Sequence, residues 1–449
     1  MGAISPELSL VHDLKVTLHR SSIITPSEKT ERRSMFLSNI DQVLNFDVET
    51  IHFFRATHDF PPEKVVQKIE KALGKLLVPY DFLAGRLRFD PQAGRLEIDC
   101  NGAGVGFAVA TSELSLDEIG DMVYPNPAFR QLIFAKEAIL GPEDQPLMLL
   151  QVTSFKCGGF AFGITNNHTT FDGFSFKIFL ENLASLASDK PLAITPYSNR
   201  HLLAARSPPT VTFSHPELSE LQLPPKGEEL QPTNLESGSN NVEFKVFHLS
   251  SDDIASLKEK AKSEGGSGPA ITGFNVVTAH IWRCRVLAAA VDHDLERTST
   301  VLYAVDLRSR LQPPLPRSYT GNAVLTGYGS ATRRELEDGP FFQLVEAVRE
   351  GATRMTDEYA RSVIDWGQLH KGFPRGDVMV SSWWKLGFSD VDFPWGRPIY
   401  CCPVMIPSID IIVLFPSVEG TDSNGVNACV ALPKECMIKF ENIFHKLLA

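Results

Sequence analysis

A histidine and an aspartate four residues apart form the most informative pattern in the chain, in the run His168-Thr-Thr-Phe-Asp172-Gly173. The apolar stretch before them, Phe160-Ala-Phe-Gly-Ile164, predicts a strand, and Gly173 to Ala187 has helical spacing. His168 would then lie where a strand turns into a helix, a place where functional groups are common. A neutral imidazole at that point could accept the proton of a substrate hydroxyl near neutral pH.

Taken alone, the His-x-x-x-Asp spacing is a weak signal. Among the 12 histidines about one accidental match is expected, and His248 with Asp252 supplies it. Asp252 falls in the first turn of a polar-faced helix, where a carboxylate complements the helix dipole without a catalytic role. For His168 the alternative is a buried histidine satisfied by the backbone, and the residues alone leave both interpretations open.

Two further stretches hold residues that are able to recognise a substrate. Asp392-Phe-Pro-Trp395-Gly396 follows Val380-Ser-Ser382-Trp383 near the C-terminus, and a lone Trp beside Gly and Pro is usually a core anchor. Val305-Asp-Leu-Arg308-Ser-Arg310 places two arginines after a predicted buried strand, where a guanidinium can pair with a buried carboxylate or a phosphate. Two solvated arginines are the alternative.

The composition argues against several classes of function. With 43 basic and 54 acidic residues the net charge is −11, so a surface for nucleic acid or anionic membrane is not expected, because both need a basic footprint. No apolar run is long enough for a membrane span, and no signal peptide is visible. No phosphate loop or hydrolase elbow occurs. The seven scattered cysteines indicate neither a disulfide framework nor a zinc site, so we expect a soluble, intracellular protein without a metal.

The elements that would position these residues mix helical and strand periods in both halves of the chain. The sequence predicts helices at Pro62 to Leu77, Gly173 to Ala187, Asp252 to Lys262, Ile271 to Val291 and Pro433 to Leu448, and strands at Leu147 to Phe155, Phe160 to Ile164, Thr300 to Val305 and Ile409 to Leu414. Between the halves, residues 205–240 contain six prolines and no regular period, which predicts a crossover linker. Domains at 1–204 and 241–449 follow, each of mixed α/β structure.

In this order, the three motifs resemble those of the BAHD acyltransferases, plant enzymes that move an acyl group from coenzyme A to an alcohol or amine. That family carries His-x-x-x-Asp-Gly in its first half and Asp-Phe-Gly-Trp-Gly near its C-terminus. The similarity covers nearly the whole chain, including residues 77–87, 279–284 and 306–322. The combination is highly specific although each short motif is not. The chain departs from the pattern at Pro394, where Gly is usual, and at Thr320, where Phe is frequent.

The resemblance implies an α/β fold of two similar chloramphenicol-acetyltransferase-like domains, each a mixed sheet flanked by helices, joined by a long crossover loop. It implies a role for each residue singled out above. His168 would be the general base, and Asp172 would brace the loop by pairing with an arginine, for which Arg308 is the candidate. Asp392 would have a similar structural part, although it is sometimes viewed as catalytic. Ser382 would line the coenzyme A channel, and Trp395 and Arg308 would also contact coenzyme A. Trp395 would in addition face the oxyanion through its indole N–H.

The activity implied is that of an acyl-CoA-dependent O-acyltransferase in plant specialised, cuticle or suberin metabolism. It would need no cofactor beyond its acyl-CoA substrate and would act as a cytoplasmic monomer on a small alcohol. Similarity around residues 182–187 and 205–209 points to the branch that transfers hydroxycinnamoyl groups to ω-hydroxy fatty acids or fatty alcohols. One alternative is a non-catalytic relative that serves as an accessory in fatty-acid elongation, against which the intact motif at His168 counts. The other is a hydrolase on the same scaffold.

Overall fold

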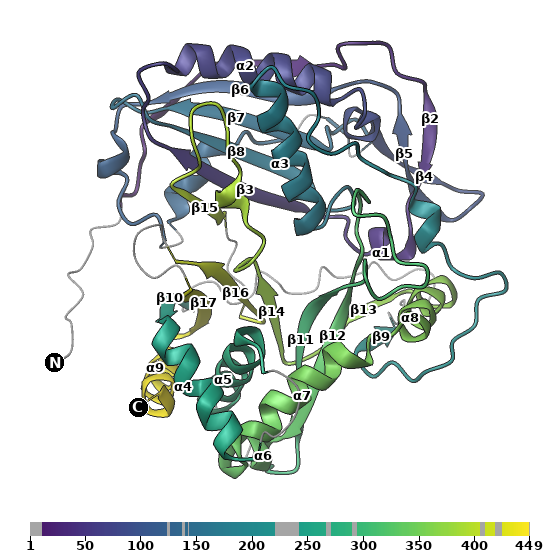
Figure 1. The fold of residues 1–449 in the computed structure, drawn as a ribbon, viewed down its shortest axis with the longest axis vertical. Coiled ribbons are helices and arrows are strands. Elements are labelled where there is room, and N and C mark those ends of the chain that lie inside the picture. Colours follow the sequence, from purple (N-terminus) through teal and green to yellow (C-terminus); the bar gives the residue numbers. More distant parts are fainter. Residues whose placement is uncertain are drawn as a thin grey trace. The chain divides into compact units, whose positions relative to one another are not determined.

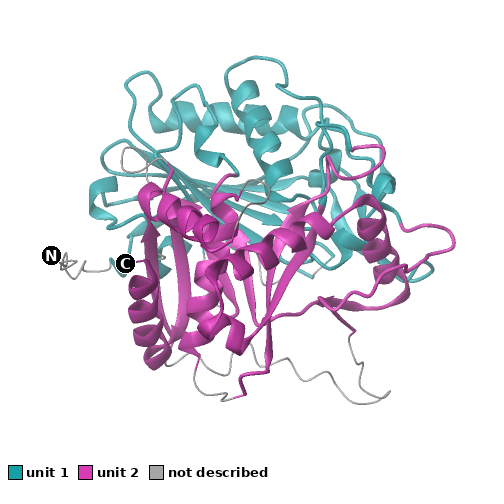
Figure 2. Cartoon of the chain, turned by 60° about the horizontal axis from the view of Figure 1, so that its bottom comes forward, with its two compact units in different colours: residues 1–204, 315–323, 386–406 teal, residues 205–314, 324–385, 407–449 magenta. Residues whose placement is uncertain are grey.

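The computed structural model describes residues 11–123, 126–136, 140–141, 143–220, 242–265, 271–289, 294–404, 409–417 and 424–448. The chain divides into two compact units (Figure 2). Unit 1 comprises residues 1–204, 315–323 and 386–406, and unit 2 comprises residues 205–314, 324–385 and 407–449. Each unit contains a six-stranded sheet with both parallel and antiparallel neighbours. The prediction of an α/β fold with a mixed sheet in each part is therefore confirmed.

The main sheet of unit 1 has the strand order β1-β6-β7-β8-β3-β15. Its strands are β1 (Val16–Ile24), β6 (Val105–Ser112), β7 (Met148–Ser154), β8 (Phe160–Asn167), β3 (Asp47–Phe54) and β15 (Tyr400–Pro403). The helices α2 (Pro62–Leu76) and α3 (Gly173–Ala187) pack against each other beside this sheet (Figure 1). In α2 the buried residues Val65, Ile69, Leu73 and Leu76 follow the spacing of one helical face.

Unit 1 also contains a smaller sheet and a short α-helix. The small sheet has the order β2-β5-β4, with β2 (Arg33–Phe36), β5 (Arg95–Cys100) and β4 (Arg86–Asp90), and the helix is α1 (Asn39–Gln42). Ser38 caps α1 by accepting the backbone N–H of Asp41, and Asp41 Oδ2 accepts the N–H of Ser38 at 2.8 Å. This capping box fixes the buried carboxylate of Asp41.

The hairpin of β7 and β8 explains how the chain reaches the first motif. The two strands pair antiparallel with Leu150 opposite Ile164, as the apolar runs predict. Every residue of β8 is buried between its neighbours β7 and β3, and a central strand covered on both faces has a continuous apolar sequence for that reason. β8 ends at Asn167, and α3 begins at Gly173. The motif therefore occupies the loop between a buried strand and a helix, as expected.

The main sheet of unit 2 has the order β10-β17-β16-β14-β11-β12. Its strands are β10 (Val242–Leu249), β17 (Val426–Pro433), β16 (Ile411–Pro416), β14 (Val378–Ser382), β11 (Thr298–Asp306) and β12 (Val324–Thr332). The strands β11, β14 and β16 run parallel. The helices are α4 (Ser251–Ser263), α5 (Gly273–Ala288), α6 (Arg333–Asp338), α7 (Phe341–Arg354), α8 (Asp357–Leu369) and α9 (Lys434–Leu448). The central helix α5 packs against α4, α7 and α9.

Two features of the fold depart from a simple division into halves. Within the stretch expected as a linker, Leu218–Glu220 forms β9, which pairs with β13 (Gly372–Pro374); residues 221–240 lie outside the described residues. The Asp-Phe-Pro-Trp-Gly motif, expected in the C-terminal domain, lies in unit 1. The physical reason is that β15 follows this motif and pairs antiparallel with β3, which extends the first sheet.

Within the described residues, no helix is long and apolar enough to cross a membrane.

Candidate active site

His168 stands directly after β8 and is held by both its main chain and its ring. Its backbone N–H donates to the carbonyl of Phe46 at 2.8 Å. Its imidazole lies tilted against the ring of Phe46, with the ring centroids 5.2 Å apart. The side chain is half-buried. A histidine fixed in this way keeps one orientation and still presents part of its ring to a ligand.

Asn322 sets the tautomer of this histidine. Its side-chain nitrogen donates to the backbone carbonyl of His168 at 2.8 Å and to Asp41 Oδ1 at 2.8 Å. Because both N–H groups of the amide are used, the amide oxygen acts as an acceptor, and it lies 3.2 Å from Nδ1 of His168. Nδ1 therefore carries the ring proton. Nε2 keeps the lone pair that a general base needs.

A buried ion pair holds Asp41, the carboxylate that accepts a hydrogen bond from this amide. Nη1 of Arg200 donates to Asp41 Oδ1 at 2.7 Å, and both side chains are fully buried. The same guanidinium donates to the carbonyl oxygens of Thr169 and Thr170, at 3.2 and 2.7 Å. Removing either charge would leave the other unpaired in the interior, which costs several kcal/mol. The ion pair therefore fixes the two residues that follow His168.

Burial lowers the pKa of His168 below the ordinary value of 6.5, because desolvation disfavours the imidazolium. The charge of Asp172 and the hydrogen bond to Asn322 act in the opposite direction without reversing the shift. The imidazole is therefore neutral near pH 7. A neutral imidazole with a free Nε2 is the form in which histidine accepts a proton.

The pH dependence of the reaction follows from this shift. We expect kcat/KM to rise with pH through one group whose pKa lies below the ordinary histidine value of 6.5, and to level off by neutral pH. The sign is positive because only the deprotonated ring of His168 acts as a base. Initial rates between about pH 4.5 and 8.5 test this expectation. A value of kcat/KM that falls as the pH rises across that range would contradict it.

Asp172 caps α3 with one carboxylate oxygen and accepts the backbone N–H of Ala323 with the other. Oδ1 accepts the backbone N–H of Ser175 at 2.8 Å, and Oδ2 accepts the backbone N–H of Ala323 at 2.9 Å. The side chain is 3% exposed, and a buried carboxylate needs such donors. Asp172 thus ties the start of α3 to the residue that follows Asn322. The predicted pairing with an arginine remains a prediction.

The two arginines after β11 have different surroundings, both within unit 2. Arg308 is buried, and its Nη1 donates to Asp306 Oδ1 at 2.8 Å. Nη1 of Arg310 donates to the carbonyl of Ala352 in the last turn of α7 at 2.8 Å, where a cation complements the helix dipole. Arg310 therefore has a local structural role. Arg308 keeps its place as the candidate partner of Asp172.

Ser382 is the last residue of β14, where it pairs with Leu414 of β16 and is half-buried. This position at the carboxyl end of a parallel strand is typical of residues that contact ligands. Asp392 is exposed and forms no ion pair within the part of the chain that the structure describes. The roles expected for these two residues remain predictions.

Pro394 lies in a tight turn that suits it. The backbone N–H of Gly396 donates to the carbonyl of Phe393 at 2.9 Å, so Pro394 occupies the second position of a β-turn. That position favours proline, whose missing N–H is not needed there. Gly396 has φ of 106°, which favours glycine. The chain therefore keeps this turn although Pro replaces the usual Gly.

Trp395 lies in an aromatic cluster. Its ring stacks on Phe393 and meets the rings of Phe54, Phe160 and Phe162 edge-on at centroid distances of 5.7 to 6.2 Å. The residue is 4% exposed, and its Nε1 has no hydrogen-bond partner among the described residues. Such packing is typical of a core anchor.

The position of this cluster bears on the expected role of the indole. Phe162 lies on β8, six residues before His168, which directly follows the strand; at about 3.3 Å per residue this separation is roughly 20 Å. An oxyanion formed beside His168 would be far from Trp395. The geometry favours the alternative interpretation, a core anchor, over an oxyanion donor. Contact between Trp395 and coenzyme A remains a prediction.

The surroundings of the second His-x-x-x-Asp match differ from those of the first. His248 is exposed on β10, and its Nδ1 lies 2.9 Å from Asn427 Oδ1. Asp252 lies in the first turn of α4, which begins with the capping box of Ser250 and Asp253. These contacts are those of a strand residue and a helix start, as the sequence indicates.

The family model described as "Transferase family" matches residues 14–447. The chain belongs to this family, the BAHD acyltransferases. The resemblance drawn from the three motifs is therefore confirmed. As a BAHD protein, the chain is an acyl-CoA-dependent acyltransferase.

Curated BAHD relatives match over nearly their full length. Acyltransferase GLAUCE of Arabidopsis thaliana is 56% identical over 450 residues, which cover 99% of this chain and 98% of the relative. Omega-hydroxypalmitate O-feruloyl transferase of Arabidopsis thaliana is 33% identical, with 97% of this chain and 93% of the relative covered. Vinorine synthase has a similar fold, with a TM-score of 0.71 at 24% identity over 94% of this chain and 96% of that chain. The two-domain acyltransferase fold is thus confirmed.

Sequence reasoning missed three residues that hold the histidine: Asn322, Asp41 and Arg200. Asn322 lies in the block 306–322, which carries part of the family resemblance, yet no role was assigned to it. Asp41 follows Ser38 by three residues, which is the spacing of a capping box and could have been read as a helix start. No local pattern identifies the partner of Arg200.

Proposed function

We propose that this BAHD enzyme transfers a hydroxycinnamoyl group from its coenzyme A thioester to the hydroxyl of an aliphatic alcohol, with His168 as the general base. The observation that carries the proposal is the Nδ1 contact with Asn322, which leaves Nε2 of His168 basic. The choice of substrates is supported by a relative whose name describes feruloyl transfer to ω-hydroxypalmitate, at 33% identity. It is also supported by the local similarity around residues 182–187 and 205–209.

The proposed reaction proceeds in two steps, and His168 moves the proton in both of them. Nε2 of His168 removes the hydroxyl proton while the alcohol oxygen attacks the thioester carbonyl, and a tetrahedral oxyanion forms. The oxyanion collapses, the carbon–sulfur bond breaks, and the departing thiolate takes the proton back from the imidazolium. The ester and coenzyme A leave, and His168 is neutral again. No acyl-enzyme and no further proton donor are required.

The residues around the ring contribute to this cycle by positioning and charge. Asn322 Oδ1 accepts the Nδ1 proton and so keeps Nε2 available. The carboxylates of Asp172 and Asp41 favour the imidazolium electrostatically at the moment it forms. Their effect is largest after proton transfer, since before it the ring is neutral. Interactions that strengthen in the transition state are the ones that raise the rate.

Asp172 is proposed as a positioning residue that pairs with Arg308. Two observations support a structural role for the carboxylate: it caps α3, and it holds the backbone of Ala323. Arg308 is buried, and because a guanidinium has five N–H donors, its ion pair with Asp306 does not exclude a second carboxylate partner. Ser382 is proposed to line the coenzyme A channel, and Asp392 to support its own loop.

Replacing Asp172 by asparagine tests the positioning role. Asparagine offers one acceptor oxygen where the carboxylate offers two, so a donor would face the N–H of Ser175 or Ala323. We expect a loss of about 1–3 kcal/mol in the free energy of unfolding, measured by urea titration, together with reduced activity. Asp253→Asn is the matched control, because that capping carboxylate accepts through Oδ2 alone. An Asp172→Asn protein that is inactive yet as stable as the parent would make Asp172 a direct participant.

The enzyme is further proposed to act in the cytoplasm as a monomer. All seven cysteines carry free thiols in the structure, which is the usual state of cysteines in a reducing compartment.

A panel of donors and acceptors tests the substrate proposal. Feruloyl-, benzoyl-, malonyl- and acetyl-CoA are each paired with a long-chain primary alcohol, an ω-hydroxy fatty acid, shikimate and an aliphatic amine. We expect the highest kcat/KM for feruloyl-CoA with one of the two aliphatic hydroxyl acceptors. A preference for acetyl- or malonyl-CoA, or for shikimate or the amine, would contradict the proposed substrates and leave the acyltransferase activity standing.

A further inference from the structure

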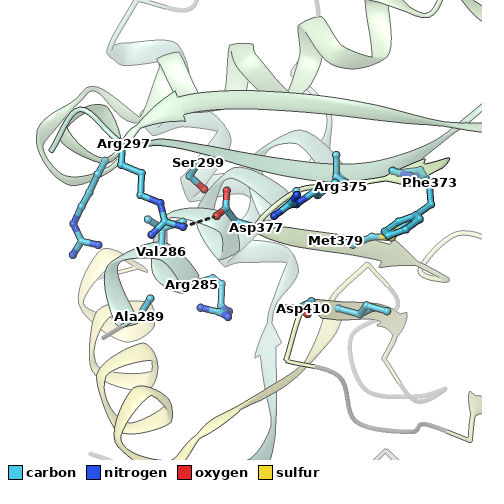
Figure 3. A pocket seen from close by; sticks show the side chains of 15 residues that line it. Arg285, Val286, Ala289, Arg297, Ser299, Phe373, Arg375, Asp377, Met379 and Asp410 are labelled. Carbon is cyan, nitrogen blue, oxygen red and sulfur yellow. Dashed lines mark hydrogen bonds and ion pairs between the residues drawn. The ribbon is translucent and has the colours of Figure 1, made fainter. Parts of the chain in front are cut away.

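A cavity of about 600 Å³ lies in unit 2 at the amino ends of the parallel strands β11, β14 and β16 (Figure 3). Its lining includes four arginines: Arg285 of α5, Arg297 before β11, Arg333 of α6 and Arg375 before β14. The lining also includes Asp377 and Asp410. Four arginines against two aspartates leave a net charge of +2, in a chain whose net charge is −11. We call this cavity the arginine pocket.

One arginine of the pocket is already paired. Figure 3 shows Arg297 turned toward Asp377, and the two side chains form an ion pair at 3.3 Å. Oδ2 of Asp377 also accepts the backbone N–H of Thr300 at 2.8 Å. Asp377 is thus occupied by partners of its own, which leaves Asp410 as the other carboxylate of the described lining against the remaining three arginines.

The other three arginines have guanidinium N–H groups without an acceptor among the described residues. Arg333 and Arg375 make no ion pair or side-chain hydrogen bond with any other residue that the structure describes. Arg285 donates to the carbonyl of Ile409 at 3.4 Å, and its enclosed Nε has no partner among the described residues. Guanidinium N–H groups that are out of contact with water and lack an acceptor are costly. An anion in the pocket would supply the missing acceptors.

Burial makes Arg285 a strong partner for such an anion. Desolvation lowers the pKa of Arg285 below its ordinary value, against the influence of Asp410, and the side chain remains a cation. Charge-assisted hydrogen bonds are stronger where water competes less. Arg285 therefore favours an oxyanion more than an arginine on the open surface does.

The pocket also presents apolar surface. Phe373 and Ile411 line it and are 50% and 38% exposed. Met379 and Leu302 belong to the same lining. Small-molecule sites combine apolar walls with a few placed polar groups in this way. A ligand that joins an oxyanion to an apolar group matches both parts of the lining.

We propose that the arginine pocket is a second binding site, for a small molecule that carries a phosphate monoester on an aromatic or aliphatic group. A phosphate monoester carries a charge of about −1.5 to −2 at pH 7, which matches the net charge of the lining. Its three oxygens accept from several guanidinium groups at once, and planar guanidinium groups bind phosphate in a bidentate manner. A carboxylate offers half the charge and fewer acceptors.

This site is separate from the residues of the acyl transfer within unit 2. Ser382 and Arg308 lie at the carboxyl ends of β14 and β11, whereas the pocket lies at the amino ends of the same strands. The nine residues of β11 span about 30 Å. The proposal therefore does not rest on the proposed substrates or on His168.

Isothermal titration of the full-length protein with phenyl phosphate tests the proposal. We expect saturable binding at one site, with weaker binding of benzoate and of inorganic phosphate, since each lacks one part of the match. Arg285→Gln and Arg333→Gln should each raise the Kd about ten-fold or more, because each removes charge-assisted hydrogen bonds. Arg334→Gln is the matched control: it is the next residue of α6, it pairs with Glu296 at 2.7 Å, and it does not line the pocket. Its Kd should equal that of the parent protein.

Thermal melts of each variant show that the fold is retained. Arg333 is the safer of the two positions, because its side chain forms no hydrogen bond with another described residue, whereas Arg285 donates to Ile409. Three results would overturn the proposal. The first is the absence of phenyl phosphate binding, or equal binding by Arg285→Gln, Arg333→Gln and the parent. The second is that inorganic phosphate binds as tightly as phenyl phosphate, which would show that the pocket does not recognise the apolar group of the ligand. The third is displacement of phenyl phosphate by coenzyme A at the concentration that saturates acyl transfer, which would place coenzyme A in this pocket.

Discussion

Replacing His168 by alanine should lower kcat by roughly 10²–10⁴-fold, the range that a positioned general base contributes. The loss is expected because the variant lacks the basic Nε2 of His168. In the parent protein, the amide oxygen of Asn322 selects the tautomer in which this nitrogen is free to accept a proton. The protein should stay folded, since His168 is half-buried and the ion pair of Asp41 and Arg200 does not depend on the imidazole. Steady-state rates and a thermal melt of the same preparation give both quantities.

The control for this variant is His248→Ala. His248 shares the His-x-x-x-Asp spacing but is exposed on β10, with its ring against Asn427. Its replacement should change neither the rate nor the melting temperature appreciably. Turnover near the parent value in His168→Ala would remove the histidine from its proposed role, whatever the control shows.

Replacing Trp395 by alanine should destabilise the protein by about 3–5 kcal/mol, the usual cost of deleting a large buried aromatic side chain. The indole is 4% exposed and contacts Phe54, Phe160 and Phe162, so the deletion leaves a void in the core of unit 1. The folded fraction should keep its specific activity because the cluster lies far from His168. Urea unfolding and rates normalised to folded protein measure the two effects.

Trp395→Phe separates packing from hydrogen bonding. Nε1 of the indole has no hydrogen-bond partner among the described residues, so phenylalanine keeps most of the ring contacts and loses no bond described there. We expect a smaller loss of stability and activity near the parent value. If the indole N–H stabilised the oxyanion instead, Trp395→Phe would lower kcat by about 10²–10³-fold with little change in stability.

Local periodicity predicted the elements that carry the first motif. The expected helix at Gly173 to Ala187 has the same bounds as α3, and the expected strand from Phe160 is β8, which continues three residues further to Asn167. These elements are predictable because their apolar spacing is set by burial against neighbours directly above and below them. The capping box of Ser250 and Asp253 is likewise a local pattern, since both of its members lie within four residues.

The residues that hold His168 could not be predicted from the sequence, because local patterns relate only residues that are close together in the chain. Asn322 and His168 are 154 positions apart, and Arg200 and Asp41 are 159 apart. No helical or strand period relates such residues, and only the paired strands and loops of unit 1 bring them together. The motif at Asp392 was likewise placed in the wrong compact unit, because β15 pairs with β3 across most of the chain.

The central claim is that the enzyme passes the acyl group directly to an alcohol through His168. The most direct test measures the free thiol of coenzyme A and the ester product in the same sample, with feruloyl-CoA and a long-chain alcohol. The proposed mechanism predicts equal amounts of thiol and ester throughout the time course, and the loss of both in His168→Ala. Thiol release without a matching amount of ester would contradict the claim and identify the protein as a thioester hydrolase.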